Sequence, residues 1–210
     1  MAAETQQVDE AVLIKQAMGG DLNSFNRIVM IYQSQAYNLA VRMLNDEALA
    51  EDATQISFIS AYQAIRSYRG GSFRAWMLRI VTNTCYDELR RQKRKPTQPL
   101  EPVAEIEENL DAEPSWLVDP NDPPEDLVIR KELEERIQGC IEGLPEEFRA
   151  VVILVDVQGM DYQEASQTVR SPVGTIRSRL ARARQRLQDC LQDSWELLPE
   201  KFRLYDEGRP

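Results

Sequence analysis

Apolar residues recur at intervals of three and four along most of this chain, which is the period of an amphipathic helix. The pattern is clearest over residues 172–191, where one stripe of the expected helix is apolar and the opposite face is basic. The stripe consists of Val173, Ile176, Leu180, Ala183, Leu187 and Leu191. No segment shows a convincing alternation of apolar and polar residues, so we expect no strands. The sequence predicts an all-α protein.

The first half of the chain is expected to form a bundle of four helices. They are a short helix that ends at Gly19-Gly20, a helix from Asp21 to about Leu44, and helices over about 46–67 and 72–94. Paired glycines end helices, and an aspartate is a good N-cap, so Asp21 is expected to cap the second helix. The Gly70-Gly71 pair separates the third helix from the fourth.

The second half is expected to form helices over about 126–142, 145–157, 161–169 and 172–191. Asp161 and Glu164 have the spacing of a capping box, and Ser171-Pro172 supplies an N-cap and a first-turn proline for the last helix. A helix, a tight turn and a second helix with a basic face form a helix-turn-helix. Many such turns carry glycine where this chain has Arg170, so we expect a strained residue or a different turn there.

A proline-rich acidic segment, residues 96–126, separates these halves. Proline blocks helical hydrogen bonds and like charges extend a chain, so we expect a flexible linker. The expected domains are therefore residues 8–95 and 127–192, followed by a tail at 193–210. Within the linker, Trp116-Leu117-Val118 either packs transiently on a domain or docks into a groove. In the tail, Trp195 begins an apolar stripe that either packs on the second domain or regulates access to a partner.

Charge along the chain is segregated, and this corrects the impression given by the net charge of −10. The chain is basic over residues 66–95, acidic in the linker and basic again from residue 170. The local field decides which partner binds where, so the basic helices are candidates for contact with a polyanion. Hypothetically, the linker carboxylates also cover these basic faces in the free protein.

The remaining composition excludes several classes of site. The chain has no histidine, which removes the commonest metal ligand and general base. Cys85, Cys140 and Cys190 are far apart and odd in number, so neither a disulfide framework nor a zinc site is expected. We expect no cofactor, no membrane insertion and a location in a reducing cytoplasm.

A second basic stripe lies on the expected helix that starts near Ser72. It carries Trp76, Arg79, Asn83, Asp87, Arg90 and Arg94. Arginines contact phosphates, asparagine reads base edges, and tryptophan stacks on bases. The flexible loop Tyr68-Arg69-Gly70-Gly71 just before it is suited to hold an unstacked base. The alternative is that Trp76 is a core residue and the glycines form an ordinary turn.

These blocks together resemble bacterial sigma factors of the extracytoplasmic-function type. Residues 9–25 resemble the opening of that family, 50–58 its polymerase-binding helix, 73–91 its promoter-opening helix and 144–184 its minus-thirty-five helix-turn-helix. The resemblance implies a four-helix region 2 domain and a region 4 domain, joined by the linker. It also implies that the protein binds core RNA polymerase through its clamp and flap regions, directs it to promoter DNA, and is held by an anti-sigma factor.

The resemblance assigns roles to individual positions. Core polymerase binding falls on Glu51, Asp52, Gln55, Phe58 and Tyr62. Contact with minus-ten DNA is assigned to Tyr68, Arg69, Trp76, Arg79, Asn83, Arg90 and Arg94. Contact with minus-thirty-five DNA is assigned to Thr175, Arg177, Ser178, Arg179, Ala181, Arg182 and Arg186. For Phe58 the alternative is a place in the core of the bundle.

Rival functions explain less of the sequence. A two-domain helix-turn-helix regulator accounts for the last helix but not for the Trp-Asn-Arg stripe of the first domain. A small enzyme would rest on scattered carboxylates, because histidine, metal-ligand spacing and a phosphate-binding glycine loop are all missing. An adaptor that does not bind DNA leaves the basic faces unexplained.

Overall fold

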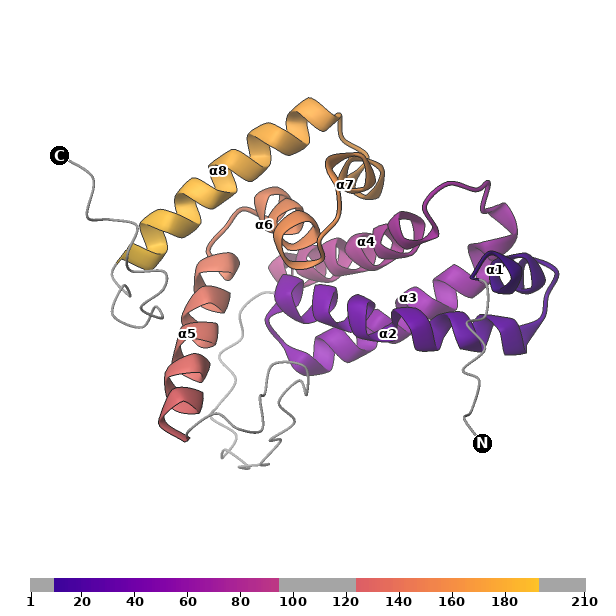
Figure 1. The fold of residues 1–210 in the computed structure, drawn as a ribbon, viewed down its shortest axis with the longest axis horizontal. Coiled ribbons are helices and arrows are strands. Elements are labelled where there is room, and N and C mark those ends of the chain that lie inside the picture. The colour runs from indigo at the N-terminus through magenta and orange to yellow at the C-terminus, as the bar shows by residue number, and fades with distance from the viewer. Residues whose placement is uncertain (1–9, 95–123, 193–210) are drawn as a thin grey trace, which may run out of the picture.

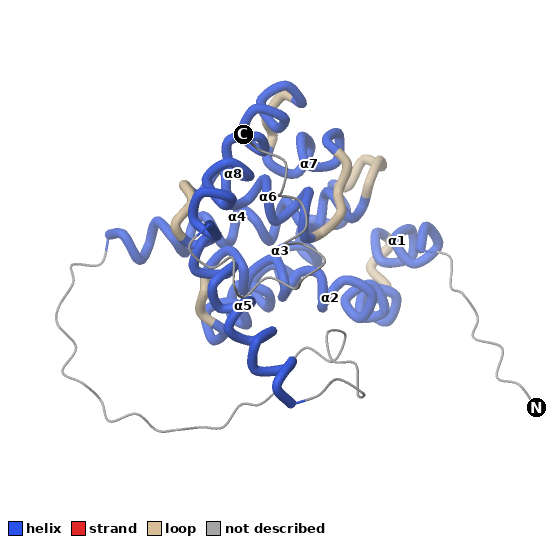
Figure 2. The backbone as a smooth tube through the Cα atoms, turned by 60° about the vertical axis from the view of Figure 1, so that its left-hand side comes forward, coloured by secondary structure: helices blue, strands red, loops and turns tan. Residues whose placement is uncertain are grey.

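The computed structural model describes residues 10–94 and 124–192, and of residues 124–130 it describes the backbone only. The expected linker with Trp116, and the tail with Trp195, lie outside the described residues. Within the described ranges every regular element is a helix, which confirms the all-α prediction (Figures 1 and 2).

The four predicted helices of the first half are all present. They are α1 (Glu10–Met18), α2 (Leu22–Leu44), α3 (Glu47–Ala64), extended by the 3-10 turn η1 (Ile65–Ser67), and α4 (Phe73–Arg94). Asp21 caps α2 as predicted, because its carboxylate accepts hydrogen bonds from the amides of Asn23 and Ser24 at 3.1 and 3.2 Å. Gly70 and Gly71 adopt φ values of 88° and 94°, so the loop before α4 uses backbone that glycine adopts most easily.

The second half contains α5 (Pro124–Glu142), α6 (Glu146–Val152), the π-helical turn η2 (Ile153–Val157), α7 (Tyr162–Val169) and α8 (Val173–Leu191). Arg170 is left-handed with φ 51° and ψ 46°, as the missing turn glycine led us to expect. Asp161 accepts the amide of Glu164 at 2.8 Å. The other half of the expected capping box is replaced, because the Glu164 carboxylate accepts a hydrogen bond from the hydroxyl of Ser72, just before α4.

The predicted N-cap of α8 is wrong. Pro172 occupies the capping position, and no side chain caps the helix. The Ser171 hydroxyl accepts instead from the guanidinium of Arg179 at 3.2 Å and donates to the Val169 carbonyl at 3.5 Å. The carbonyl of Pro172 accepts hydrogen bonds from the amides of Thr175 and Ile176, so the helix begins on backbone contacts alone.

Helices from the two predicted domains share one set of buried apolar side chains. α7 packs against α4, and α2 packs against α5, α6 and η2 (Figure 1). Arg149 ties the two halves, since its buried guanidinium donates to the Met43 carbonyl at 2.7 Å and also to that of Glu142. Burial lowers the pKa of Arg149. The described residues therefore form one packed unit around α4 and α7.

The expectation that the chain has no disulfide is wrong. Cys140 and Cys190 are bonded, with their Cα atoms 5.9 Å apart. The C-terminal ends of α5 and α8 meet in space, a proximity that a separation of 50 residues does not reveal. Cys85 is a free, buried thiol in α4 whose pKa burial raises to about 12.

Among the described residues, no helix combines the length and the apolar character that crossing a membrane would require.

Candidate nucleic-acid interface

The outer face of α8 is basic and open, and its inner face is buried. Ile176, Leu180 and Ala183 lie in the core, as the apolar stripe predicts. Arg177, Ser178, Ala181, Arg182 and Arg186 are exposed, and Thr175 and Arg179 are half-buried. This arrangement gives one helix face that carries positive charge and leaves room at Ala181 for close approach of a polyanion.

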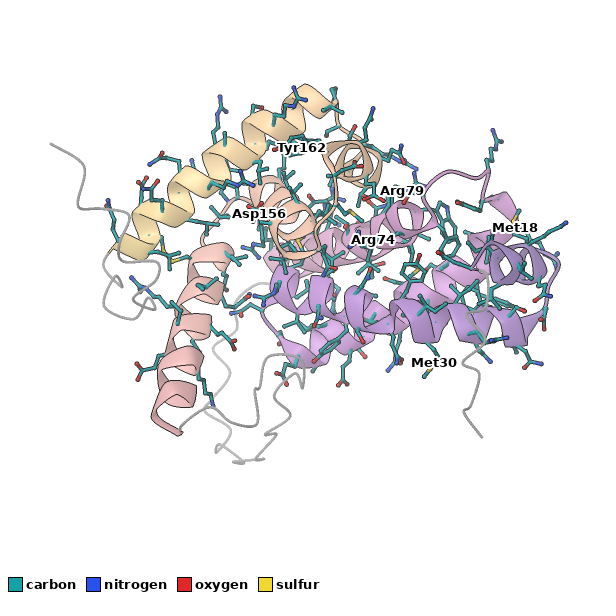
Figure 3. All side chains as sticks on the ribbon, viewed as in Figure 1. Met18, Met30, Arg74, Arg79, Asp156 and Tyr162 are labelled. Carbon is teal, nitrogen blue, oxygen red and sulfur yellow. A yellow bond between two sulfur atoms is a disulfide. The ribbon has the colours of Figure 1, made fainter. Side chains whose placement is uncertain are left out.

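Neighbouring elements hold several of these arginines in place. Arg184 forms a two-point ion pair with Asp156 of η2, at 3.0 and 2.5 Å, and Arg179 pairs with Glu147 of α6. Arg177 lies over the ring of Tyr162 at 5.5 Å, as Asp156 and Tyr162 approach α8 (Figure 3). Such contacts orient the guanidinium groups while leaving the outer face open.

Arg182 differs from these arginines. It is exposed on the outer face and has no ion pair among the described residues. Its guanidinium is therefore free to meet a ligand without first breaking an internal contact.

The second basic surface lies at the start of α4. Trp76 is half-buried, with its ring centroid 5.2 Å from that of Phe73 and 5.6 Å from that of Tyr68. The Tyr68 hydroxyl donates to the Gly71 carbonyl at 2.7 Å, which fixes the loop beside the tryptophan. Trp76 is thus packed on one side and exposed on the other, so it belongs only partly to the core.

Beside Trp76 lies a hollow of about 360 Å³. Its lining includes Tyr68, Arg69, Gly70, Trp76, Arg79 and Gln167. The volume falls in the ordinary range of small-ligand sites, ~300–1,000 Å³. Sequence reasoning placed the loop, Trp76 and Arg79 together, but it missed Gln167, which α7 brings in from the second half of the chain.

Charge is concentrated along the rest of the α4 stripe. Asn83, Arg90 and Arg94 are exposed, and Arg90 pairs with Asp87 at 3.1 Å. The pKa of Arg79 is lowered by burial and by the nearby positive charge of Arg170. The charge of Arg170, in the turn after α7, therefore repels that of Arg79, which lines the hollow, and a bound anion would relieve this repulsion.

On α3 the structure corrects one member of the expected surface. Phe58 is only 9% exposed and belongs to the core, whereas Glu51, Asp52 and Gln55 are exposed. Tyr62 is 39% exposed and packs its ring edge on Phe25 at 5.0 Å.

Two isoleucines provide the apolar part of this surface. Ile56 and Ile59 are 53% and 59% exposed, and sequence reasoning did not assign them to it. Their spacing from Asp52 and Gln55 is the signal that would have found them, since residues three and four apart share a helix face.

Comparison with known proteins assigns both surfaces to one family. Residues 28–95 match Sigma-70 region 2 and residues 134–187 match Sigma-70 region 4. This chain belongs to the sigma-70 family. The first match holds α3, α4 and most of α2, and the second holds the helix-turn-helix with most of α8.

Relatives define the branch of the family. The RNA polymerase sigma-H factor of Pseudomonas aeruginosa is 33% identical over 189 residues, covering 90% of this chain and 96% of that protein. The ECF RNA polymerase sigma-E factor of Escherichia coli K12 is 35% identical over 190 residues, covering 90% and 97%. The protein is an RNA polymerase sigma factor of the ECF type.

Solved structures agree with this sigma factor in fold. CnrH, determined in complex with the cytosolic domain of CnrY, superposes with a TM-score of 0.64 at 22% identity, over 88% of this chain and 97% of that one. The sigma factor RpoE of Bartonella quintana, in complex with the anti-sigma factor NepR, gives 0.59 at 21% identity, over 81% and 98%.

Proposed function

We propose that this sigma factor binds core RNA polymerase through α3 and directs it to promoters by two DNA-contacting surfaces, one on α8 and one at the start of α4. The observation that supports this most directly is the pairing of two exposed basic faces on separate helices, one of them beside an aromatic hollow. A regulator that reads only duplex DNA has no use for the second surface.

On α8, we assign base reading in the minus-thirty-five element to Arg177, Ser178 and Arg182. Their side chains are exposed over two turns whose opposite face is anchored in the core. Arg186 is placed to hold a phosphate, and Arg179, bound to Glu147, acts mainly by positioning the helix. Thr175 and Ala181 lie at the edge and centre of the same face, where small side chains permit close approach.

On α4, the hollow between Tyr68, Arg69 and Trp76 would receive an unstacked base of the minus-ten element. Asn83 would read an adjacent base edge, while Arg79, Arg90 and Arg94 would hold the backbone. Gln167 of α7 lines the same hollow. Because α7 packs on α4 beside this hollow, we infer that α7 moves away from α4 when promoter DNA binds along the stripe.

The exposed face of α3 would contact core polymerase. Ile56 and Ile59 supply an apolar centre, and Glu51, Asp52, Gln55 and Tyr62 surround it. An apolar patch with a polar rim is the usual composition of a protein interface. In this proposal the polymerase catalyses RNA synthesis in the cytoplasm. This chain contributes promoter specificity and no catalysis. Since the sigma factor RpoE, which has the same fold, was solved with the anti-sigma factor NepR, we assign this chain a partner of that class.

The test is abortive transcription with purified core polymerase and a pool of promoter fragments from the source genome, with and without this protein. Initiation that depends on the protein at a defined subset is the expected result. If the protein binds duplex DNA tightly but does not bind core polymerase, the proposal fails and the protein is a two-domain regulator.

A matched pair of variants sharpens this experiment. Asn83→Ala should raise the free-energy barrier to initiation by about 1–3 kcal/mol, which lowers the initiation rate, and should relax selectivity at one minus-ten position. Asn26→Ala, an exposed asparagine on α2, is the control and should behave like the parent protein. Equal losses in both would contradict the assignment of Asn83.

A further inference from the structure

The disulfide joins the helices that frame the helix-turn-helix. Cys140 lies near the C-terminal end of α5 and Cys190 near that of α8. The two cysteines are separated by 50 positions in the sequence, and the stretch between them contains α6, η2, α7 and nearly all of α8. The bond therefore closes a loop around the whole DNA-reading unit.

The last turns of α8 depend on this bond more than the first turns do. Ile176, Leu180 and Ala183 fix the first part of the helix in the core, whereas every residue from 184 to 191 is at least partly exposed. The noncovalent contacts near the end are weak, for example the hydrogen bond from Arg136 to the Cys190 carbonyl at 3.4 Å. Without the bond, the described residues near the end of α8 are held by such contacts, by partial packing of Leu187 on the core and by Arg186, which lies 5.3 Å from the ring of Phe148.

The bonded pair is accessible to small reagents. Cys140 is 4% exposed, but Cys190 is half-buried, and both line an open hollow of about 610 Å³. Attack on a disulfide needs access to one sulfur atom only, and Cys190 provides it. Cys85 contrasts with this pair, because it is fully buried and its pKa is raised to about 12, so its thiol stays protonated and inert.

We propose that Cys140 and Cys190 are a reversible thiol–disulfide pair whose oxidation clamps the end of α8 to α5. In the forward direction, two thiols transfer two electrons and two protons to a small disulfide. The S–S bond of that reagent breaks, two reagent thiols form, and the Cys140–Cys190 bond is made. A small dithiol reverses the step. Disulfides in proteins of a reducing compartment are usually of this reversible kind.

Clamping has a specific consequence for DNA binding, and this consequence rests on the proposed function of α8. Arg186 lies one turn before Cys190 and is assigned to a phosphate, whereas Arg177 and Ser178 lie in the part anchored by the core. Oxidation should therefore tighten binding to all duplex sequences by a similar factor and leave base preference unchanged.

The chemical test uses the full chain equilibrated with mixtures of oxidised and reduced dithiothreitol, then alkylated and mapped by peptide mass. Cys140 and Cys190 should change together, and Cys85 should stay a free thiol throughout. Amide hydrogen exchange of the same samples should rise on reduction in peptides covering residues 184–192 and stay constant in those covering 173–180. Three free thiols under every mixture, or exchange that does not change on reduction, would overturn the proposal.

Variants separate the switch from general instability. Reduction should lower the melting temperature of the parent protein by roughly 4 °C or more. Reduction should not change the melting temperature of the Cys190→Ser protein. It should lower that of the Cys85→Ala protein by as much as it lowers that of the parent, each measured against its own oxidised form. A shift that persists in Cys190→Ser would assign the effect elsewhere and overturn the proposal. If the exchange and melting results hold but neither redox form binds duplex DNA, the switch stands and the DNA-binding role of α8 falls.

Discussion

Arg170 occupies the turn between α7 and α8 with φ 51°, a left-handed backbone conformation that is strained for residues other than glycine. Its charge also lies near enough to Arg79 to lower the pKa of that residue. At this residue, local backbone strain and like-charge repulsion both oppose the packed state. The sequence signalled the strain because helix-turn-helix turns commonly use glycine there, but only the structure placed Arg79 beside it.

Replacing Arg170 with glycine should raise stability by about 0.5–1 kcal/mol, since relief of strain exceeds the added freedom of the unfolded chain. Thermal unfolding measures the change. Gly159→Ala is the opposite control: φ is +66° and a Cβ would meet nothing within 4 Å, so backbone strain alone should destabilise the protein. A lower melting temperature in Arg170→Gly would show that the arginine side chain makes a stabilising contact.

At the scale of the element, α3 shows how far periodicity determines exposure. Its pattern correctly places Glu51, Asp52 and Gln55 on the outside, but Phe58 lies in the core and Ile56 and Ile59 lie outside. When a helix has apolar residues on more than one face, its sequence pattern does not predict which face the bundle will bury. Packing against α2 and α4 made that choice.

The exposed isoleucines lead to a prediction about α3. Ile56→Ser together with Ile59→Ser should weaken binding to core polymerase about tenfold or more, because the apolar centre of an interface carries much of its affinity. The fold should be retained, as both side chains are more than half exposed. Competition against a labelled parent protein for core polymerase gives the ratio.

The control for this change is Met30→Ser on α2, where the methionine is 68% exposed on another part of the surface (Figure 3). It should compete as well as the parent protein. Equal weakening by the control, or none by the double variant, would place the polymerase contact elsewhere. Phe58→Ala should act differently, by destabilising the whole protein by about 3–5 kcal/mol.

At the scale of the whole molecule, the packing of α7 on α4 places a helix of region 4 against the proposed minus-ten surface. Ser72 donates to Glu164 at 2.9 Å, Arg74 approaches the same carboxylate at 3.9 Å, and Thr168 donates to the Ala75 carbonyl at 3.3 Å. The sequence suggested that linker carboxylates cover the arginines of the free protein. That segment lies outside the described residues, and α7 supplies a second way of covering them.

Glu164→Ala removes the acceptor shared by Ser72 and Arg74 and should weaken the contact between α4 and α7 by roughly 1–2 kcal/mol. The free protein should then bind single-stranded minus-ten DNA roughly fivefold more tightly, since the open state is more populated. Fluorescence polarisation with the labelled strand measures this. Glu134→Ala, an exposed carboxylate on α5, changes the charge equally and should have no such effect. Unchanged affinity in Glu164→Ala would mean that α7 does not limit access.

The sequence by itself determined the helices, the Asp21 cap, the strained turn at Arg170 and the family, because each depends on residues close together in the chain. Only the tertiary structure decided that Phe58 is buried, that Gln167 joins the hollow beside Trp76, and that Cys140 meets Cys190. These features bring together helices that are distant in the sequence. Their energy comes from burial and contact across the fold, and a pattern of neighbouring residues does not encode which helices will meet.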